Sequence, residues 1–207
     1  MSAKLERKFK SLFYRYAQDE SLCSTLWTEL YSAYTADNRF YHNLAHLANM
    51  IEELEVIEDK ISDFDTLLFS VFYHDFIYRP TSNDNEIKSA EIANRRLQMI
   101  NFPPEKMVKV SSQIRATEQH HRSEDPDTNY LLDADLAVLG RDRGSYEIYR
   151  SQIRKEYSVY PDILYKPGRK KVLTKILESK EIYKTLHFRQ KYERMARENM
   201  QRELGSL

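Results

Sequence analysis

Apolar side chains recur three and four residues apart along almost the whole chain, which is the spacing of one buried face of an α-helix. The first such face comprises Leu5, Phe9, Leu12, Phe13 and Tyr16. No stretch alternates apolar and polar residues for long enough to predict a strand, and four glycines in 207 residues disfavour a hairpin-rich β-fold. The sequence therefore predicts an all-α protein, a compact single-domain bundle of about eight to ten helices that spans residues 1–207.

Prolines and polar clusters predict where several of these helices begin and end. Residues 66–78 are apolar nearly all round and are therefore expected to form a central helix. Residues 105–121 follow two prolines and are expected to form one helix, whereas the polar segment 122–129 is expected to be a loop. The Lys-Pro-Gly sequence at 166–168 predicts a break between two helices.

The charge and composition of the chain exclude several classes of protein. Lysine plus arginine and aspartate plus glutamate each number 32, and this balance argues against a nucleic-acid-binding protein, which normally has a basic excess. No apolar run approaches the ~18 to 20 residues that cross a membrane, and the first residues lack the apolar segment of a signal peptide. Cys23 is the one cysteine, which excludes an internal disulfide and a cysteine-based zinc site. We therefore expect a cytoplasmic protein in which histidine and carboxylate would hold any metal.

Two pairs of polar residues stand out within apolar segments. In YHNLAHLANM, residues 41–50, His42 and His46 are four apart and would share one face of a helix. His74 and Asp75 are adjacent in FYHDFIY, where an unpaired charge would be costly to bury. Each pair has an ordinary structural explanation as well, because histidines four apart arise by chance and a buried His–Asp pair can bond to itself.

A third segment, LLDADLAVLG, places Asp133 and Asp135 among apolar residues. Helical side chains two residues apart diverge by about 200°, so only one of these aspartates would face a shared centre. The three segments together can supply two imidazoles and two carboxylates, a set that suits Mn²⁺, Fe²⁺, Co²⁺, Ni²⁺, Zn²⁺ or, less well, Mg²⁺. The sequence thus predicts a divalent metal ion held inside a helical bundle.

The order of these motifs resembles the HD superfamily of metal-dependent phosphohydrolases, and YHNLAH is similar to the YHNxxH motif of cyclic-nucleotide phosphodiesterases. The segments HDFIYRPTSNDNEIKSAEIA, IRATEQH and LDADLAVLG also resemble a small bacterial subgroup of HD phosphohydrolases. This similarity covers residues 27–199, with the metal-site core at about 40–140. The resemblance therefore implies a fold like that of HD domains and phosphodiesterases.

The resemblance also implies roles for particular residues. The metal ligands would be His46, His74, Asp75 and Asp135, and His42 would protonate the leaving oxygen, as the first histidine of the phosphodiesterase motif does. Cyclic-nucleotide specificity is not carried over, because the chain has a tyrosine at position 78 where the phosphodiesterases have a further histidine. Their nucleotide-binding glutamine and aromatic clamp have no counterpart in this sequence either.

Several other residues carry weaker predictions. Glu86 could hold the attacking water, or it could simply belong to a helix cap. His120 and Thr117 could contact substrate, and His120 with its neighbouring histidine could bind a second metal; histidines at a helix C-terminus are equally favourable. Arg154 and Arg169 could bind substrate phosphates, although most basic residues are simply solvated.

These observations predict a phosphohydrolase in which metal-activated water attacks phosphorus in a small phosphate ester, a nucleotide or a nucleotide derivative. The expected partner is therefore a small phosphorylated molecule, with no membrane and no nucleic acid, and a homodimer is compatible with the sequence. One alternative is a non-catalytic module in which a metal ties helices together or a ligand is sensed. Another is a helical protein- or RNA-binding protein with an incidental His–Asp pair.

Overall fold

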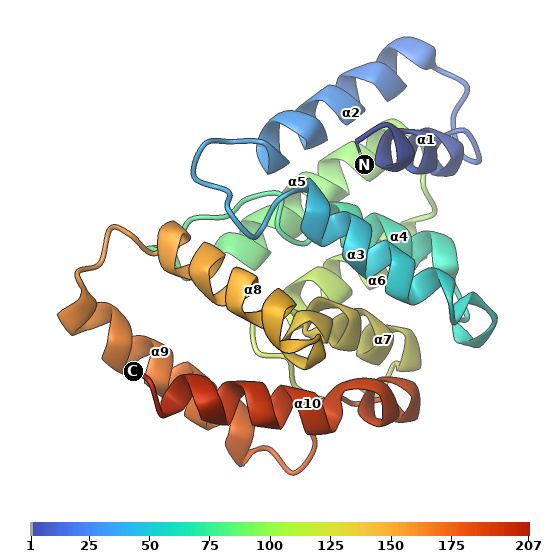
Figure 1. Ribbon diagram of the computed structural model, residues 1–207. Coiled ribbons are helices and arrows are strands. Elements are labelled where there is room, and N and C mark those ends of the chain that lie inside the picture. The colour runs from blue at the N-terminus through green and yellow to red at the C-terminus, as the bar shows by residue number, and fades with distance from the viewer. Residues whose placement is uncertain (1) are drawn as a thin grey trace.

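Helix α4 lies at the centre of the bundle, as the computed structural model of residues 2–207 shows (Figure 1). Every residue of α4 from Thr66 to Tyr73 is buried, and the helix contacts α3, α5, α6 and α7. This arrangement confirms the central position that its apolar sequence predicts, because a helix that is apolar all round needs neighbours on every side.

The regular elements of residues 2–207 are ten α-helices and two short 3₁₀ helices, without a strand, which confirms the predicted all-α bundle. Residues 2–207 also contain no helix with both the length and the hydropathy needed to cross a membrane. The α-helices are α1 (Ser2–Phe13), α2 (Glu20–Tyr34), α3 (Leu44–Glu55), α4 (Phe64–Tyr73), α5 (Asn85–Met99), α6 (Pro104–Ala116), α7 (Pro126–Asp135), α8 (Arg143–Glu156), α9 (Asp162–Glu178) and α10 (Leu186–Leu204); the 3₁₀ helices are η1 (Glu58–Lys60) and η2 (Ala137–Gly140).

Helix α4 ends at Tyr73, so the expectation of one helix over residues 66–78 is wrong for its last five residues. A side chain distant in the sequence forms hydrogen bonds with the backbone carbonyl groups of the turn that follows. Arg39 donates hydrogen bonds to the carbonyl oxygen of Asp75 at 2.7 Å and to that of Phe76 at 2.9 Å. Because a side chain satisfies these carbonyls, the chain can leave the helix without losing hydrogen bonds. The His–Asp pair therefore lies at the end of a buried helix rather than in its middle.

The boundaries of α6 and α7 also differ from expectation. Helix α6 ends at Ala116, not at residue 121, and His120 lies in the following loop with a left-handed φ of 51°. Helix α7 begins at Pro126, inside the segment expected to be a loop. Asp125 caps it by accepting hydrogen bonds from the amide of Thr128 at 3.1 Å and from its hydroxyl at 2.7 Å. The polar residues of this segment form a helix cap, which their composition alone does not distinguish from a loop.

Helix α9 runs unbroken through the Lys-Pro-Gly sequence, so the predicted break at 166–168 is wrong. Pro167 lacks the N–H that would bond to the carbonyl of Ile163. The side chain of Ile163 is 80% exposed, so water can reach that part of the helix and the missing bond costs little. Helix α9 packs against α10 at the edge of the molecule, away from α1 and α2 (Figure 1).

Gly140, at the end of η2, lies directly against α10. A Cβ atom here would clash with Cβ of Tyr192 and lie 2.7 Å from its carbonyl oxygen. Since that neighbour is helix backbone and cannot yield, we expect Gly140→Ala to lower the free energy of unfolding by about 1 to 3 kcal/mol. Gly168→Ala is the matched control, because nothing lies within 4 Å of a Cβ there and alanine should stabilise the α9 interior by up to about 1 kcal/mol. Chemical denaturation of both variants checks this; equal stabilities would contradict it.

Candidate metal centre

His46, His74 and Asp75 form a buried group that could hold a metal ion. His46 lies on α3, His74 caps the end of α4, and Asp75 follows it in the turn. The Nε2 atoms of the two histidines are 3.2 Å apart. Oδ2 of Asp75 lies 3.0 Å from Nε2 of His74 and 3.8 Å from Nε2 of His46. Three potential ligand atoms thus converge on one point from two helices.

Asp135, the last residue of α7, adds a fourth potential ligand. Its Oδ1 lies 3.1 Å from Nε2 of His46 and 3.8 Å from Nε2 of His74. Ligand atoms about 2.0 to 2.2 Å from a tetrahedral or octahedral metal lie roughly 3.0 to 3.5 Å from their neighbours. The distances from Asp135 to the two histidines are thus close to those within a coordination shell, while the compact group with all its atoms within 4.8 Å of one another is His46, His74 and Asp75.

The hydrogen bonds of His74 also fit a cation at this point. Nδ1 of His74 lies 2.9 Å from the carbonyl oxygen of Val71 and must donate to it, so Nε2 faces the carboxylate of Asp75. Burial opposes a charge on this ring, but the neighbouring carboxylate of Asp75 raises the pKa of His74 to about 9. The surroundings of Nε2 thus favour a positive charge, either a proton or a metal ion that displaces it.

The structure separates the two aspartates of the DAD sequence. Asp133 is fully buried and accepts hydrogen bonds from the backbone amides of Lys184 and Thr185, each at 2.7 Å. It therefore holds the segment that leads into α10 and points away from the candidate metal ligands. Asp135 faces the ligands with one oxygen, and its other oxygen, Oδ2, lies 2.8 Å from Nε2 of His120. A histidine on the outer oxygen of a ligating carboxylate is a usual means of orienting it.

His42 does not share a helix face with His46, which corrects the expectation from their spacing. Helix α3 begins at Leu44 with Asn43 as its N-cap, so His42 lies in the segment before the helix. The two imidazole rings are nonetheless near each other, with centroids 5.8 Å apart. Tertiary packing thus brings the pair together, although the helical spacing that suggested it is absent.

Glu156, at the end of α8, holds His42 in place, and sequence reasoning missed it. Its Oε2 lies 2.7 Å from Nδ1 of His42 and accepts a hydrogen bond from the hydroxyl of Tyr78 at 3.0 Å. Its Oε1 accepts bonds from the backbone amides of Tyr41 and His42. The ring of Tyr78 stacks on that of His42 with centroids 4.1 Å apart. Because 114 residues separate Glu156 from His42, no local pattern could have indicated this contact.

These contacts favour the protonated form of His42. Because Nδ1 bonds to Glu156, Nε2 is the ring nitrogen that could donate to a substrate. Burial lowers the pKa of His42, but the charge of Asp75 and the hydrogen bond to Glu156 outweigh it, so the pKa is raised overall. Burial likewise opposes the charge of Glu156, yet its bond to His42 keeps the pKa of this carboxyl below its usual value. A charged pair of this kind can deliver a proton near neutral pH.

The remaining candidate residues divide into two groups. Glu86 and Thr117 line the same cavity as Asp75 and Asp135, and burial raises the pKa of Glu86. Neither arginine offers a free guanidinium. Arg154 bonds to Asp162 and to the carbonyl oxygens of residues 157 and 160, and Arg169 pairs with a glutamate of α10. The two phosphate-binding candidates are thus already engaged within the protein.

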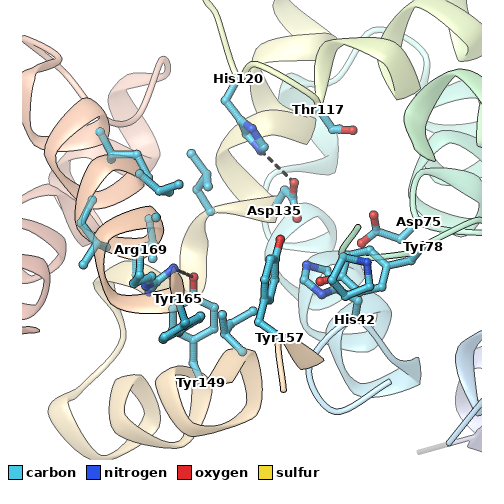
Figure 2. Close-up of a pocket in the computed structure, with 18 of the residues that line it drawn as sticks. His42, Asp75, Tyr78, Thr117, His120, Asp135, Tyr149, Tyr157, Tyr165 and Arg169 are labelled. Atoms are coloured by element: carbon cyan, nitrogen blue, oxygen red, sulfur yellow. Dashed lines mark hydrogen bonds and ion pairs between the residues drawn. The ribbon is translucent and has the colours of Figure 1, made fainter. Parts of the chain in front are cut away.

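Two of the potential ligands, Asp75 and Asp135, line a cavity of about 690 Å³. Its inner end is formed by His42, Asp75, His120 and Asp135, and its outer part by tyrosine and aliphatic side chains of α8 and α9 (Figure 2). Comparison of the chain with protein-family models, curated proteins and solved structures gives no match.

Proposed function

We propose that this protein is a metal-dependent phosphohydrolase that acts on a small phosphate ester. One observation carries the proposal: Nε2 of His46 and Nε2 of His74 each lie 3.0 to 3.8 Å from a carboxylate oxygen of Asp75 and of Asp135, and both carboxylates line a large cavity that His42 also lines. A divalent ion held by these four side chains would polarise a phosphoryl oxygen and activate water for attack at phosphorus. The resemblance of the motifs to HD phosphohydrolases supports the same reaction.

The protein's own residues would supply the proton transfers. Nδ1 of His42 is engaged with Glu156, so its Nε2 would give a proton to the leaving oxygen when the P–O bond breaks. Glu86 lines the cavity as a half-buried carboxylate with a raised pKa, which suits it to orient the attacking water and accept its proton. The apolar part of the cavity would exclude bulk water around the reacting ester.

A non-catalytic metal site remains the second candidate, and the cavity argues against it. A structural site encloses its ion with protein ligands, whereas Asp75 and Asp135 line an open cavity of about 690 Å³. An ion that only ties helices together would also need no proton donor such as the His42–Glu156 pair beside it. An adjacent proton donor and an accessible cavity both favour catalysis.

Removal of the metal tests this proposal directly. We expect the purified protein to contain a divalent ion. Removal of this ion with a chelator should lower the melting temperature by about 5 to 10 °C, which is the stabilisation expected from a ligand present at about 100 times its Kd. Hydrolysis of phosphate esters should stop on chelation and return when Mn²⁺ is added. Elemental analysis, a thermal melt and phosphate release provide the three measurements. A metal-dependent melting temperature without turnover of any ester would favour the structural alternative.

A further inference from the structure

The cavity extends well beyond the space that a phosphate group needs. Its volume of about 690 Å³ lies within the ~300 to 1,000 Å³ of sites that enclose whole small-molecule ligands. The inner end holds the metal-ligand group, and the outer part reaches between α8 and α9, where Tyr149, Tyr157, Tyr165 and Arg169 lie (Figure 2). A phosphate at the inner end would therefore leave the outer part free for the rest of the substrate.

Helix α9 turns an apolar stripe toward this outer space. Leu164, Gly168 and Val172 are four residues apart and line the cavity together with Leu173 and Ile176. The stripe is incompletely covered by protein, since Leu164 is 60% exposed and Val172 is 49% exposed. Apolar side chains that line a cavity without packing against other residues favour an apolar ligand.

The outer space offers no free positive charge. Within residues 2–207, Arg169 is the one lysine or arginine that lines the cavity, and it is buried. Its Nε and Nη2 donate to the two carboxylate oxygens of Glu203 at 2.9 and 3.0 Å, which neutralises its charge. A second or third phosphate group would therefore meet no unpaired cation in the outer space. This charge distribution disfavours polyphosphates.

The tyrosines give this space an aromatic character with one unsatisfied polar group. Tyr149, Tyr157, Tyr160 and Tyr165 line it. Tyr165 is nine-tenths buried, and its hydroxyl has no hydrogen-bond partner in the described part of the chain. The lining of the outer space is thus aromatic, which suits a flat, apolar ligand.

We propose that this outer space binds the leaving group of a phosphomonoester, and that this group is uncharged and aromatic. The inference rests on the proposed function, because it places the ester phosphate at the metal-ligand group. It deepens that function by naming the substrate class: esters with one phosphate and a flat, apolar body, rather than nucleoside di- or triphosphates. Leu164, Tyr165, Gly168 and Val172 are the residues that determine this specificity.

Two measurements on the metal-loaded protein test the inference. The first is the binding of 1-naphthylmethylphosphonate, measured by the fluorescence anisotropy of its naphthyl group. This compound cannot be hydrolysed at phosphorus, because a C–P bond replaces the ester O–P bond. The second is hydrolysis of 1-naphthyl phosphate, glycerol 3-phosphate and adenosine 5′-triphosphate. We expect KM to be at least about tenfold lower for 1-naphthyl phosphate than for the other two, because a hydrophobic pocket discriminates by about that factor or more for each methylene-sized group it binds, whereas the better leaving group of the aryl ester acts mainly on kcat.

Gly168 allows a variant that fills the space without harming the fold. Nothing lies within 4 Å of a Cβ at this position, and both alanine and leucine favour the helix more than glycine does. Gly168→Leu should weaken binding of the naphthyl phosphonate by about tenfold or more, whereas Gly168→Ala should leave it within about twofold.

The outcomes separate this inference from the proposed function. Phosphonate binding that weakens in Gly168→Leu supports the inference even if no ester is hydrolysed, and in that case the hydrolase proposal fails alone. Hydrolysis with no difference in KM among the three esters, or with the lowest KM for the triphosphate, overturns the inference and leaves the hydrolase proposal standing. Equal phosphonate binding by Gly168→Leu and Gly168→Ala also overturns it.

Discussion

We expect Asp75→Asn to lose both its divalent ion and its phosphate-ester hydrolysis while it keeps the helical fold. Asparagine has nearly the same shape as aspartate but lacks the charge, and Oδ2 of Asp75 lies 3.0 Å from Nε2 of His74. Loss of one charged partner from a buried group costs about 2 to 5 kcal/mol. For the Asp75 carboxylate this corresponds to roughly 30- to 5,000-fold weaker binding of the divalent ion. Elemental analysis, Mn²⁺ titration and phosphate release measure the change, and circular dichroism checks the fold.

The DAD sequence provides a matched control for this experiment. Asp135→Asn should weaken metal binding as Asp75→Asn does, because Oδ1 of Asp135 lies 3.1 Å from Nε2 of His46. Asp133→Asn should keep the metal and instead lower the free energy of unfolding, since Asp133 bonds to the amides of Lys184 and Thr185. If Asp133→Asn lost the metal and Asp135→Asn retained it, the assignment of ligands would be wrong.

We expect His42→Gln to slow hydrolysis of alkyl phosphates by about 10²- to 10⁴-fold without loss of the metal, because the leaving alkoxide would lack its proton donor. The effect should depend on the leaving group. 4-Nitrophenyl phosphate releases a weakly basic phenolate that needs no proton, so the same variant should hydrolyse it nearly as fast as the unchanged protein. Comparison of kcat for the two kinds of ester measures this difference. An equal loss for both would exclude His42 as the general acid.

Glu156 is a positioning residue in this scheme, and its effect should appear in the pH profile. The bond to Glu156 and the charge of Asp75 raise the pKa of His42 against the effect of burial, so protonated His42 persists to higher pH. Glu156→Gln keeps an oxygen for the amides of Tyr41 and His42 but removes the charge. The upper pH limit of kcat should therefore move to lower pH, with an activity loss of about 10- to 100-fold at neutral pH. An unchanged profile would indicate a purely structural role.

The fold class and the segments that carry the candidate metal ligands were predictable because they are local features. Apolar spacing identified the helices, and imidazoles and carboxylates in apolar segments marked His46, His74 and Asp75 as groups that must find partners. Local patterns failed where distant residues decide the conformation. Arg39 bonds to the carbonyls that follow α4 and so allows that helix to end at Tyr73.

The candidate site itself depends on contacts that no short segment encodes. The spacing of Asp133 and Asp135 shows that one of them must turn away, and the resemblance to HD motifs favours Asp135 as the ligand. The packing of α7 beside α3 and the segment before α10 is what directs Asp135 to the site and Asp133 away from it. The partner of His42 lies 114 residues away on α8, and the outer wall of the cavity comes from α9, which the sequence predicted to be broken. Helical hydrogen bonds join residues four apart, so the local sequence is enough to predict where helices form. A buried site forms where burial of apolar surface forces remote side chains together, and that convergence is a property of the whole packed chain.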